Sequence, residues 1–179
     1  MPSLPLICHP DTPPSGAPFR LWVNVDYSAA FGIHATLNLA FCIGAPAERF
    51  VLSETAEPGR ADELWKTTCF EGFLWAEDEP GYTEWNFAPS GDWAAYAFDG
   101  YRERMANAED VAPPYVRMED NFTWWTVLAT IAVPARQRYA LGLSGVLEQQ
   151  DGTKSYWALA HPPGAPDFHH PDCFVARLP

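Results

Sequence analysis

The stretch LWKTTCFEGFLWAEDEPGYTEWNFAPSGDWAAYAF, residues 64–98, decides the fold of this chain. Within it, three short runs at 68–76, 82–88 and 93–98 are separated by the turn-forming segments EDEPG and PSG. Side chains in such runs alternate between the two faces of a sheet, a period of two that is typical of half-buried β-strands. The stretch therefore predicts an antiparallel hairpin across EDEPG, followed by a third strand.

Only one way of pairing the first two strands keeps charged residues off the core face. That pairing forms an uncharged core face from Phe70, Leu74, Trp85 and Phe87. It also gathers polar side chains on the opposite face, namely Glu71, Glu84 and Asn86, among the aromatic residues Phe73, Trp75 and Tyr82. A slip of one residue would put charge into the core, so the register is well specified.

The rest of the chain continues the same alternating pattern. Further strands are expected at 20–27, 33–43, 122–133, 139–148 and 153–161, and in the terminal FVARL. SAAFG joins the first two of these, and Asp151-Gly152 is a tight turn of the hairpin-favouring kind. Residues 1–17 read as a Pro-rich lead-in that forms an extended strand or arm, 44–63 as an acidic loop, and 99–121 as one short helix or a long loop. The predicted fold is all-β: an antiparallel β-sandwich with jelly-roll-like or immunoglobulin-like layers, forming a single domain over 1–179.

Charge and composition exclude several classes of partner. The 23 acidic and 11 basic residues give a formal net charge of −12, and such a surface repels nucleic-acid phosphates and anionic membranes. The N-terminus shows no export signal, and no run of about 20 apolar residues is present, so a cytoplasmic location is expected. The four cysteines form no CxxC pair, which favours reduced thiols over disulfides.

The combined pattern D-x-LWKTTCFEGFL, Y-T-E-W-N-F-A-P-S-G-D-W-A-A-Y-A-F and YR resembles the core of the DOMON-like proteins, a group related to family 9 carbohydrate-binding modules. The C-terminal SYWALAHPPGAPDFHHPDCF and the N-terminal CHPDTPP are similar to the same group, so the resemblance covers roughly 60–178 and the start of the chain. It implies a jelly-roll-like sandwich with ligand-binding ability.

In the sugar-binding members of this group, a Trp followed six positions later by a Glu contributes to the site. The matching residues here are Trp65 and Glu71, while the second aromatic residue that closes over the sugar has Phe174 and Trp157 as its nearest candidates. Related DOMON domains bind haem through Met and His. Only Met105 and Met118 are available besides the initiator, and we expect no cofactor.

Two further groups of residues are candidates for the site. The segment from His161 to Asp172 is rich in His and Asp, but its spacing matches no zinc pattern, so hydrogen bonds of the histidines to the backbone are expected and no metal. If this loop covers the sheet, His161 and His169 are its best contributors. Arg102 pairs with Glu71 or Glu84, or else is an ordinary surface residue.

These patterns lead to two functional hypotheses. The first is a non-catalytic module that binds a sugar or a sugar-like molecule, because aromatic rings cover the apolar face of a sugar while carboxylates and amides contact its hydroxyls. The second is a small hydrolase, lyase or isomerase that uses the carboxylates as acid and base. The expected ligand-binding residues are Trp65, Glu71, Tyr82, Glu84, Asn86, Arg102, Trp157, His161 and His169. The oligomeric state is left open.

Overall fold

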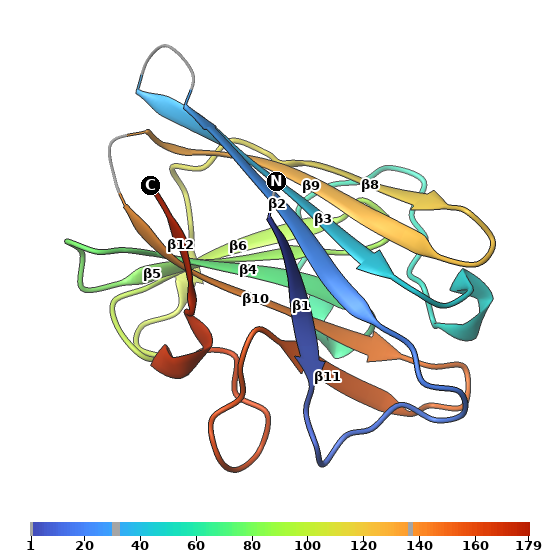
Figure 1. Cartoon of the computed structure of the whole chain (residues 1–179). Coiled ribbons are helices and arrows are strands. Elements are labelled where there is room, and N and C mark those ends of the chain that lie inside the picture. Colours follow the sequence, from blue (N-terminus) through green and yellow to red (C-terminus); the bar gives the residue numbers. More distant parts are fainter. Residues whose placement is uncertain (1, 30–32, 136–137) are drawn as a thin grey trace.

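The computed structural model describes residues 2–29, 33–135 and 138–179. The elements in chain order are β1 (Ser3–Cys8), β2 (Leu21–Ala29), β3 (His34–Ile43), η1 (Ala47–Arg49), η2 (Leu64–Lys66), β4 (Cys69–Ala76), β5 (Tyr82–Phe87), β6 (Trp93–Phe98), β7 (Ala106–Asn107), β8 (Tyr115–Asp120), β9 (Trp125–Pro134), β10 (Tyr139–Glu148), β11 (Lys154–Ala158), η3 (Pro171–Cys173) and β12 (Ala176–Leu178). Apart from the three single-turn 3₁₀ segments, the described elements are strands (Figure 1). The predicted all-β, antiparallel fold is confirmed.

The hairpin formed by β4 and β5 has the predicted register. Phe70 lies opposite Phe87, Glu71 opposite Asn86, and Phe73 opposite Glu84. Phe70, Leu74, Trp85 and Phe87 accordingly face the main core, and Glu71, Glu84 and Asn86 share the other face with Phe73 and Tyr82. The prediction that the polar residues project from one sheet face is confirmed.

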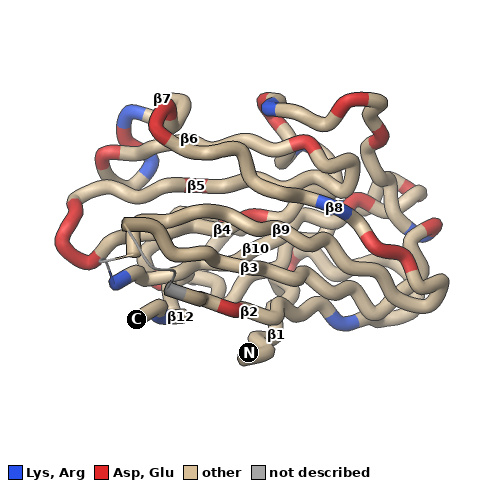
Figure 2. The backbone as a smooth tube through the Cα atoms, turned by 90° about the horizontal axis from the view of Figure 1, so that it is seen from above, with Lys and Arg blue, Asp and Glu red and all other residues tan. Residues whose placement is uncertain are grey.

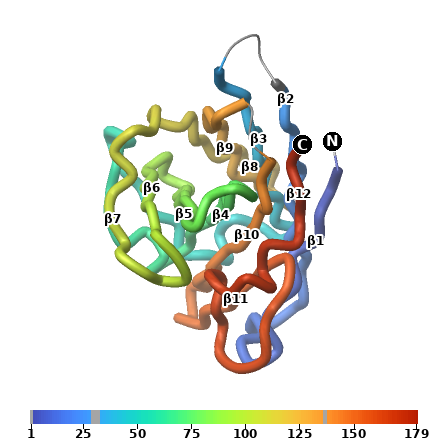
Figure 3. The backbone as a smooth tube through the Cα atoms, turned by 90° about the vertical axis from the view of Figure 1, so that its left-hand side faces the viewer, coloured from blue at the N-terminus to red at the C-terminus, as the bar shows by residue number. Residues whose placement is uncertain are grey.

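The strands form one continuous sheet instead of two separate ones. Its order is β7-β6-β5-β4-β10-β11-β1-β2-β3-β9-β8, with β12 paired to β10. Figure 3, which looks along the strands, shows that the sheet curls until β3 and β9 lie opposite β4 and β5. The N-terminal strand β1 joins the two parts of the sheet, because it pairs with β11 on one side and with β2 on the other. The expected pair of sandwich layers is therefore replaced by two facing halves of a single curled sheet.

Large side chains fill the space between the two halves. The Phe41 ring of β3 lies 5.0 Å from the Phe70 ring of β4, and the Trp125 ring of β9 lies 5.7 Å from Phe70. Trp85 and Trp93 also face inward, whereas Trp124 is 41% exposed. Of the adjacent Trp124 and Trp125, Trp125 is therefore the one that points inward. Burial of these rings supplies most of the driving force that keeps the sheet curled.

The segment 99–121 is the main departure from the predicted elements. It contains no helix among its described residues and instead enters β8, an edge strand that pairs with β9. The strand is hard to recognise because only Val116 and Met118 pack inward, between exposed or half-buried polar neighbours. The lead-in 1–17, by contrast, contains the strand β1, in agreement with the expected extended strand or arm. The SAAFG connection lies largely outside the described residues.

The predicted turn at Asp151-Gly152 joins β10 to β11. The Gly152 N–H donates to the Gln149 carbonyl at 2.9 Å, and Gly152 has a φ of +85°, a conformation that an L side chain adopts only with strain. We expect Gly152→Ala to lower the free energy of unfolding by about 1 kcal/mol in denaturant titrations. Gly59→Ala is the matched control, because a methyl group meets open space at both positions and Gly59 lacks the positive φ. Equal losses in the two variants would contradict the argument.

The charged residues lie mostly on the loops and at the strand ends, while the central strands are largely uncharged (Figure 2). In the part of the chain that the structure describes, no helix has the length and the apolar character to span a membrane.

Candidate functional site

A cavity of about 370 Å³ lies over the polar face of the β4–β5 hairpin, on the outside of the curled sheet. Three segments wall it: η2, the loop that follows β6, and the loop between β11 and η3. Its lining consists of Trp65, Glu71, Glu84, Phe98, Arg102, Met105, Val146, Tyr156, Pro166, Phe168 and His169. The cavity thus combines two carboxylates with several aromatic rings.

Glu71 forms part of the floor, on the strand between β5 and β10. Its side chain is 4% exposed, and its Oε2 accepts a hydrogen bond of 2.7 Å from Ser144 Oγ on β10. Burial, together with repulsion from Glu84, raises the pKa of Glu71 to about 8, and the Ser144 hydroxyl and Arg102 oppose this shift only in part. Glu71 therefore binds its proton at neutral pH in the free protein.

Glu84 is held beside Glu71 by a second buried group. It is 5% exposed, and its Oε1 accepts a 2.7 Å hydrogen bond from Asn86 Nδ2. Behind the amide, the buried Cys69 thiol lies 3.6 Å from Asn86 Oδ1. Burial also raises the pKa of Glu84, with Asn86 and Arg102 acting in the opposite direction. Desolvation thus disfavours ionisation of both carboxyl groups.

His169 adds a neutral imidazole to the wall. Burial and the Arg102 guanidinium lower its pKa to about 4. Tyr82 Oη accepts from the Arg102 backbone N–H at 3.3 Å and shares a 2.7 Å hydrogen bond with His169 Nδ1. The other ring nitrogen, Nε2, faces Glu84 Oε2 at 3.6 Å. His169 is therefore a neutral imidazole held beside Glu84.

The two loops that wall the cavity are joined at its rim. Arg102 Nη2 donates to Asp167 Oδ1 at 2.8 Å, and the Tyr101 hydroxyl donates to the other oxygen of the same carboxylate. Asp167 also accepts the His169 backbone N–H at 3.2 Å. Because the guanidinium is occupied by Asp167, it makes no direct ion pair with Glu71 or Glu84, contrary to one sequence expectation. It still acts on both of them through space.

The structure brings together most of the predicted site residues. Trp65, Glu71, Glu84, Arg102 and His169 line the cavity, and Tyr82 and Asn86 hold the lining residues by hydrogen bonds. Trp65 lies in η2 immediately before β4, with its ring edge-on to Tyr96 at 5.7 Å.

Trp157 and His161 lie elsewhere, so the structure does not bring these two predicted residues to this cavity. Trp157 pairs with Gly145 on the core face of the sheet, where its ring packs 5.0 Å from Phe19 and is 5% exposed. His161 contacts the N-terminal segment, with Nε2 hydrogen-bonded to the Ile7 carbonyl at 2.8 Å and the ring 4.9 Å from His9. His161 thus confirms the expected bond to the backbone. Phe174, the other candidate for the closing aromatic, packs on Phe73 beside the cavity.

Several contributors were missed from the sequence: Ser144, which bonds Glu71, and the lining residues Phe98, Met105, Val146, Tyr156, Pro166 and Phe168. A signal existed for Tyr156, because neighbours in a strand face opposite sides and an inward Trp157 places Tyr156 outward. The Tyr156 and Phe168 rings lie 6.1 Å apart and form the aromatic wall that sequence reasoning had assigned to Trp157 or Phe174.

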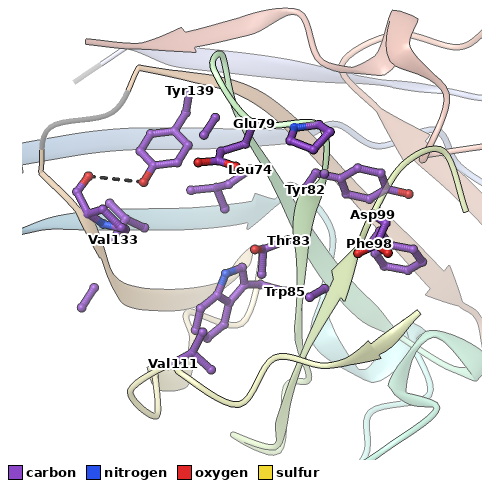
Figure 4. A pocket seen from close by; sticks show the side chains of 16 residues that line it. Leu74, Glu79, Tyr82, Thr83, Trp85, Phe98, Asp99, Val111, Val133 and Tyr139 are labelled. Atoms are coloured by element: carbon purple, nitrogen blue, oxygen red, sulfur yellow. Dashed lines mark hydrogen bonds between the residues drawn. The ribbon is translucent and has the colours of Figure 1, made fainter. Parts of the chain in front are cut away.

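A second cavity, of about 400 Å³, opens on the core side at one end of the curled sheet (Figure 4). Leu74, Trp85, Val133 and Tyr139 contribute to its mainly apolar lining, and Tyr139 donates to the Pro134 carbonyl at 3.3 Å. The two acidic residues among its described lining residues, Glu79 and Asp99, are exposed, so it has no buried carboxyl pair like that of Glu71 and Glu84. Within 2–29, 33–135 and 138–179, no group of three or more His, Cys, Asp or Glu is arranged to hold a metal, and the four cysteines are free thiols.

Comparisons with known proteins bear on the fold. No family model and no curated protein matches the chain. A proposed carbohydrate-binding protein from Bacteroides uniformis is similar over 96% of this chain and 83% of that one, with a TM-score of 0.56 and 16% identity. A family 9 carbohydrate-binding module from Caldicellulosiruptor kristjanssonii, solved with glucose, covers 84% and 71% with a TM-score of 0.47 and 12% identity. The first likeness shows a shared fold, and membership of the DOMON-like group stays a prediction.

Proposed function

We propose that the protein binds a sugar or a sugar-like small molecule in the cavity above Glu71 and Glu84, without chemically changing it. The carrying observation is a pair of buried carboxyl groups that face a cavity walled by aromatic rings. Aromatic rings cover the C–H face of a sugar, and carboxyl and amide groups accept or donate hydrogen bonds to its hydroxyls. The shared fold with a proposed carbohydrate-binding protein supports the same assignment, as does the sequence resemblance to DOMON-like proteins.

A second candidate function is acid–base catalysis on the same ligand. It is favoured by one observation, the raised pKa of Glu71 beside a second buried carboxyl group, since an acid with a pKa near the working pH is suited to proton transfer. The two candidates differ in the fate of the ligand. NMR spectra of a bound sugar after prolonged incubation show an unchanged compound if the protein only binds it, and a new compound if it is an enzyme.

The binding proposal is tested by a thermal-shift screen against simple sugars, because a ligand of the folded state raises its stability. Calorimetric titration of the hits then measures affinity. We expect Trp65→Ala to weaken binding by roughly tenfold, through loss of the stacking wall. Trp124→Ala is the matched control, since Trp124 is exposed and lies outside the cavity lining. Unchanged affinity in Trp65→Ala, or equal weakening in both variants, would place the ligand elsewhere.

A further inference from the structure

The charges around the cavity do not balance. Glu71 and Glu84 face it from β4 and β5, and Arg102, the one cation among the described residues of its lining, is already bound to Asp167. The remaining titratable groups that pack against the two carboxyl groups are uncharged at neutral pH. They are His169, with its pKa lowered to about 4, and Tyr82, Tyr96 and Cys69, whose pKa values are raised. With Arg102 offset by Asp167, the cavity therefore carries two uncompensated negative charges when both glutamates ionise.

The carboxyl groups also have unused acceptor positions. Only Oε2 of Glu71 is hydrogen-bonded to another described residue, and Oε1 has no such partner. Glu84 uses Oε1 for Asn86, and its Oε2 has only His169 Nε2 at 3.6 Å, beyond hydrogen-bond distance. Both side chains are more than nine-tenths buried and both line the cavity. Glu71 Oε1 and Glu84 Oε2 are thus available to accept hydrogen bonds from a ligand.

The walls suit a cation as well. Aromatic side chains attract a cation placed over their ring faces, and this attraction is stronger when the site excludes water. Trp65, Tyr156 and Phe168 supply such rings around the two carboxyl groups. The net charge of −12 on the whole chain adds a field that attracts cations.

We infer that the ligand carries a protonated amine, which sits between Glu71 and Glu84, so that the preferred ligands are amino sugars. This inference rests on the proposed function and specifies its ligand class. An ammonium group donates three hydrogen bonds, enough to satisfy both free carboxylate oxygens. It also neutralises the charge that otherwise keeps one of the glutamates protonated.

Proton release follows from this arrangement. The free protein binds a proton on Glu71 at neutral pH, and an ammonium ligand favours the ionised carboxylate, so binding expels that proton. The affinity for a ligand that keeps its own charge therefore rises with pH up to about 8, at most about tenfold per pH unit. A neutral sugar gives no such gain.

The test is calorimetric titration with four probes: 6-amino-6-deoxyglucose, glucosamine, glucose and N-acetylglucosamine. At pH 7 we expect at least one amino sugar to bind ten or more times tighter than both neutral sugars. Titration in phosphate and in Tris, whose ionisation enthalpies differ, should show proton release with the amino sugar only. The affinity of 6-amino-6-deoxyglucose, an alkylamine that is still charged at pH 8, should rise between pH 6 and pH 8.

Glu71→Gln and, separately, Glu84→Gln should each reduce the preference for the amino sugar at least tenfold, with the melting transition showing that each variant is folded. Glu54→Gln is the matched control, because it removes the same charge from an exposed residue outside the cavity. Glucose binding without any preference for the amino sugars would overturn the inference and leave the proposed function standing. Cyclohexylamine binding as tightly as the amino sugar would support a cation site and overturn the sugar assignment. Absence of binding by all probes would overturn both.

Discussion

Replacing Glu71 by Gln is expected to change how stability depends on pH. In the natural protein the free energy of unfolding should fall by about 2 kcal/mol between pH 6.5 and pH 8, and the substitution should remove this fall. Glu71 has a pKa near 4.5 when exposed and about 8 in the folded protein, so the native state binds more protons than the unfolded state across this interval. Stability must therefore fall as pH rises, by about 1.4 kcal/mol per unit at most. The raised pKa of Glu84 acts in the same direction.

His169 confines this fall in stability to pH values above about 6.5. Its pKa is lowered from 6.5 to about 4, so below pH 6.5 the unfolded state binds the extra proton and stability rises with pH. The two slopes oppose each other between about pH 4.5 and pH 6.5, which leaves a plateau there.

Urea titrations of the natural protein and of Glu71→Gln at half-unit pH steps measure both effects. In Glu71→Gln the profile should rise up to pH 6.5 and then become flatter, with a gain in stability at pH 8. A natural protein whose stability is constant or rising between pH 6.5 and pH 8 would show that Glu71 ionises normally. The proposed proton release on binding would then lose its basis.

Trp125→Ala is expected to lower the free energy of unfolding by about 3–5 kcal/mol, the cost of removing a large buried side chain. Trp125 is 0% exposed and packs on Phe50 and Phe70, with ring centroids at 5.5 and 5.7 Å. It lies on β9 and contacts β4, so its loss opens a cavity between the two facing halves of the sheet. A loss of this size is a large fraction of the stability of an ordinary domain.

Trp125→Phe provides the matched comparison. The indole Nε1–H of Trp125 is buried and has no hydrogen-bond partner among the described residues, which costs the native state free energy. Phe keeps most of the ring and removes this donor, so we expect a loss of no more than about 1 kcal/mol. Denaturant titrations of both variants give the difference. Similar losses in the two would mean that the Nε1–H is satisfied or that the ring contacts matter little.

The position of the glutamates has a cost that Ser144, Asn86 and Arg102 offset only in part. Two carboxyl groups are buried side by side, where each disfavours ionisation of the other, and such an arrangement lowers the stability of the free protein at alkaline pH. A core of apolar residues on this face would avoid that cost. The paired glutamates therefore do not serve folding, which agrees with the proposed role in ligand recognition.

Most strands could be predicted from the sequence because the alternation of side chains is a local property of an extended backbone. The expected runs 68–76, 82–88 and 93–98 agree with β4, β5 and β6 to within one residue at each end. The edge strand β8 was missed, because only Val116 and Met118 on it pack against the core, too few to give a clear period. The continuity of the sheet through β1 was missed as well, since Pro-rich sequence does not indicate pairing on both sides.

The sequence by itself determined that Glu71, Glu84 and Asn86 share a face, because strand parity and the exclusion of charge from the core leave only one register. Only the tertiary structure decided that this face becomes a walled cavity. Its walls depend on the contact between Arg102 and Asp167, 65 positions apart, and on the pairing that turns Trp157 inward and Tyr156 outward. Such contacts follow from the closing of the whole sheet, and no local pattern of residues encodes where two distant loops meet.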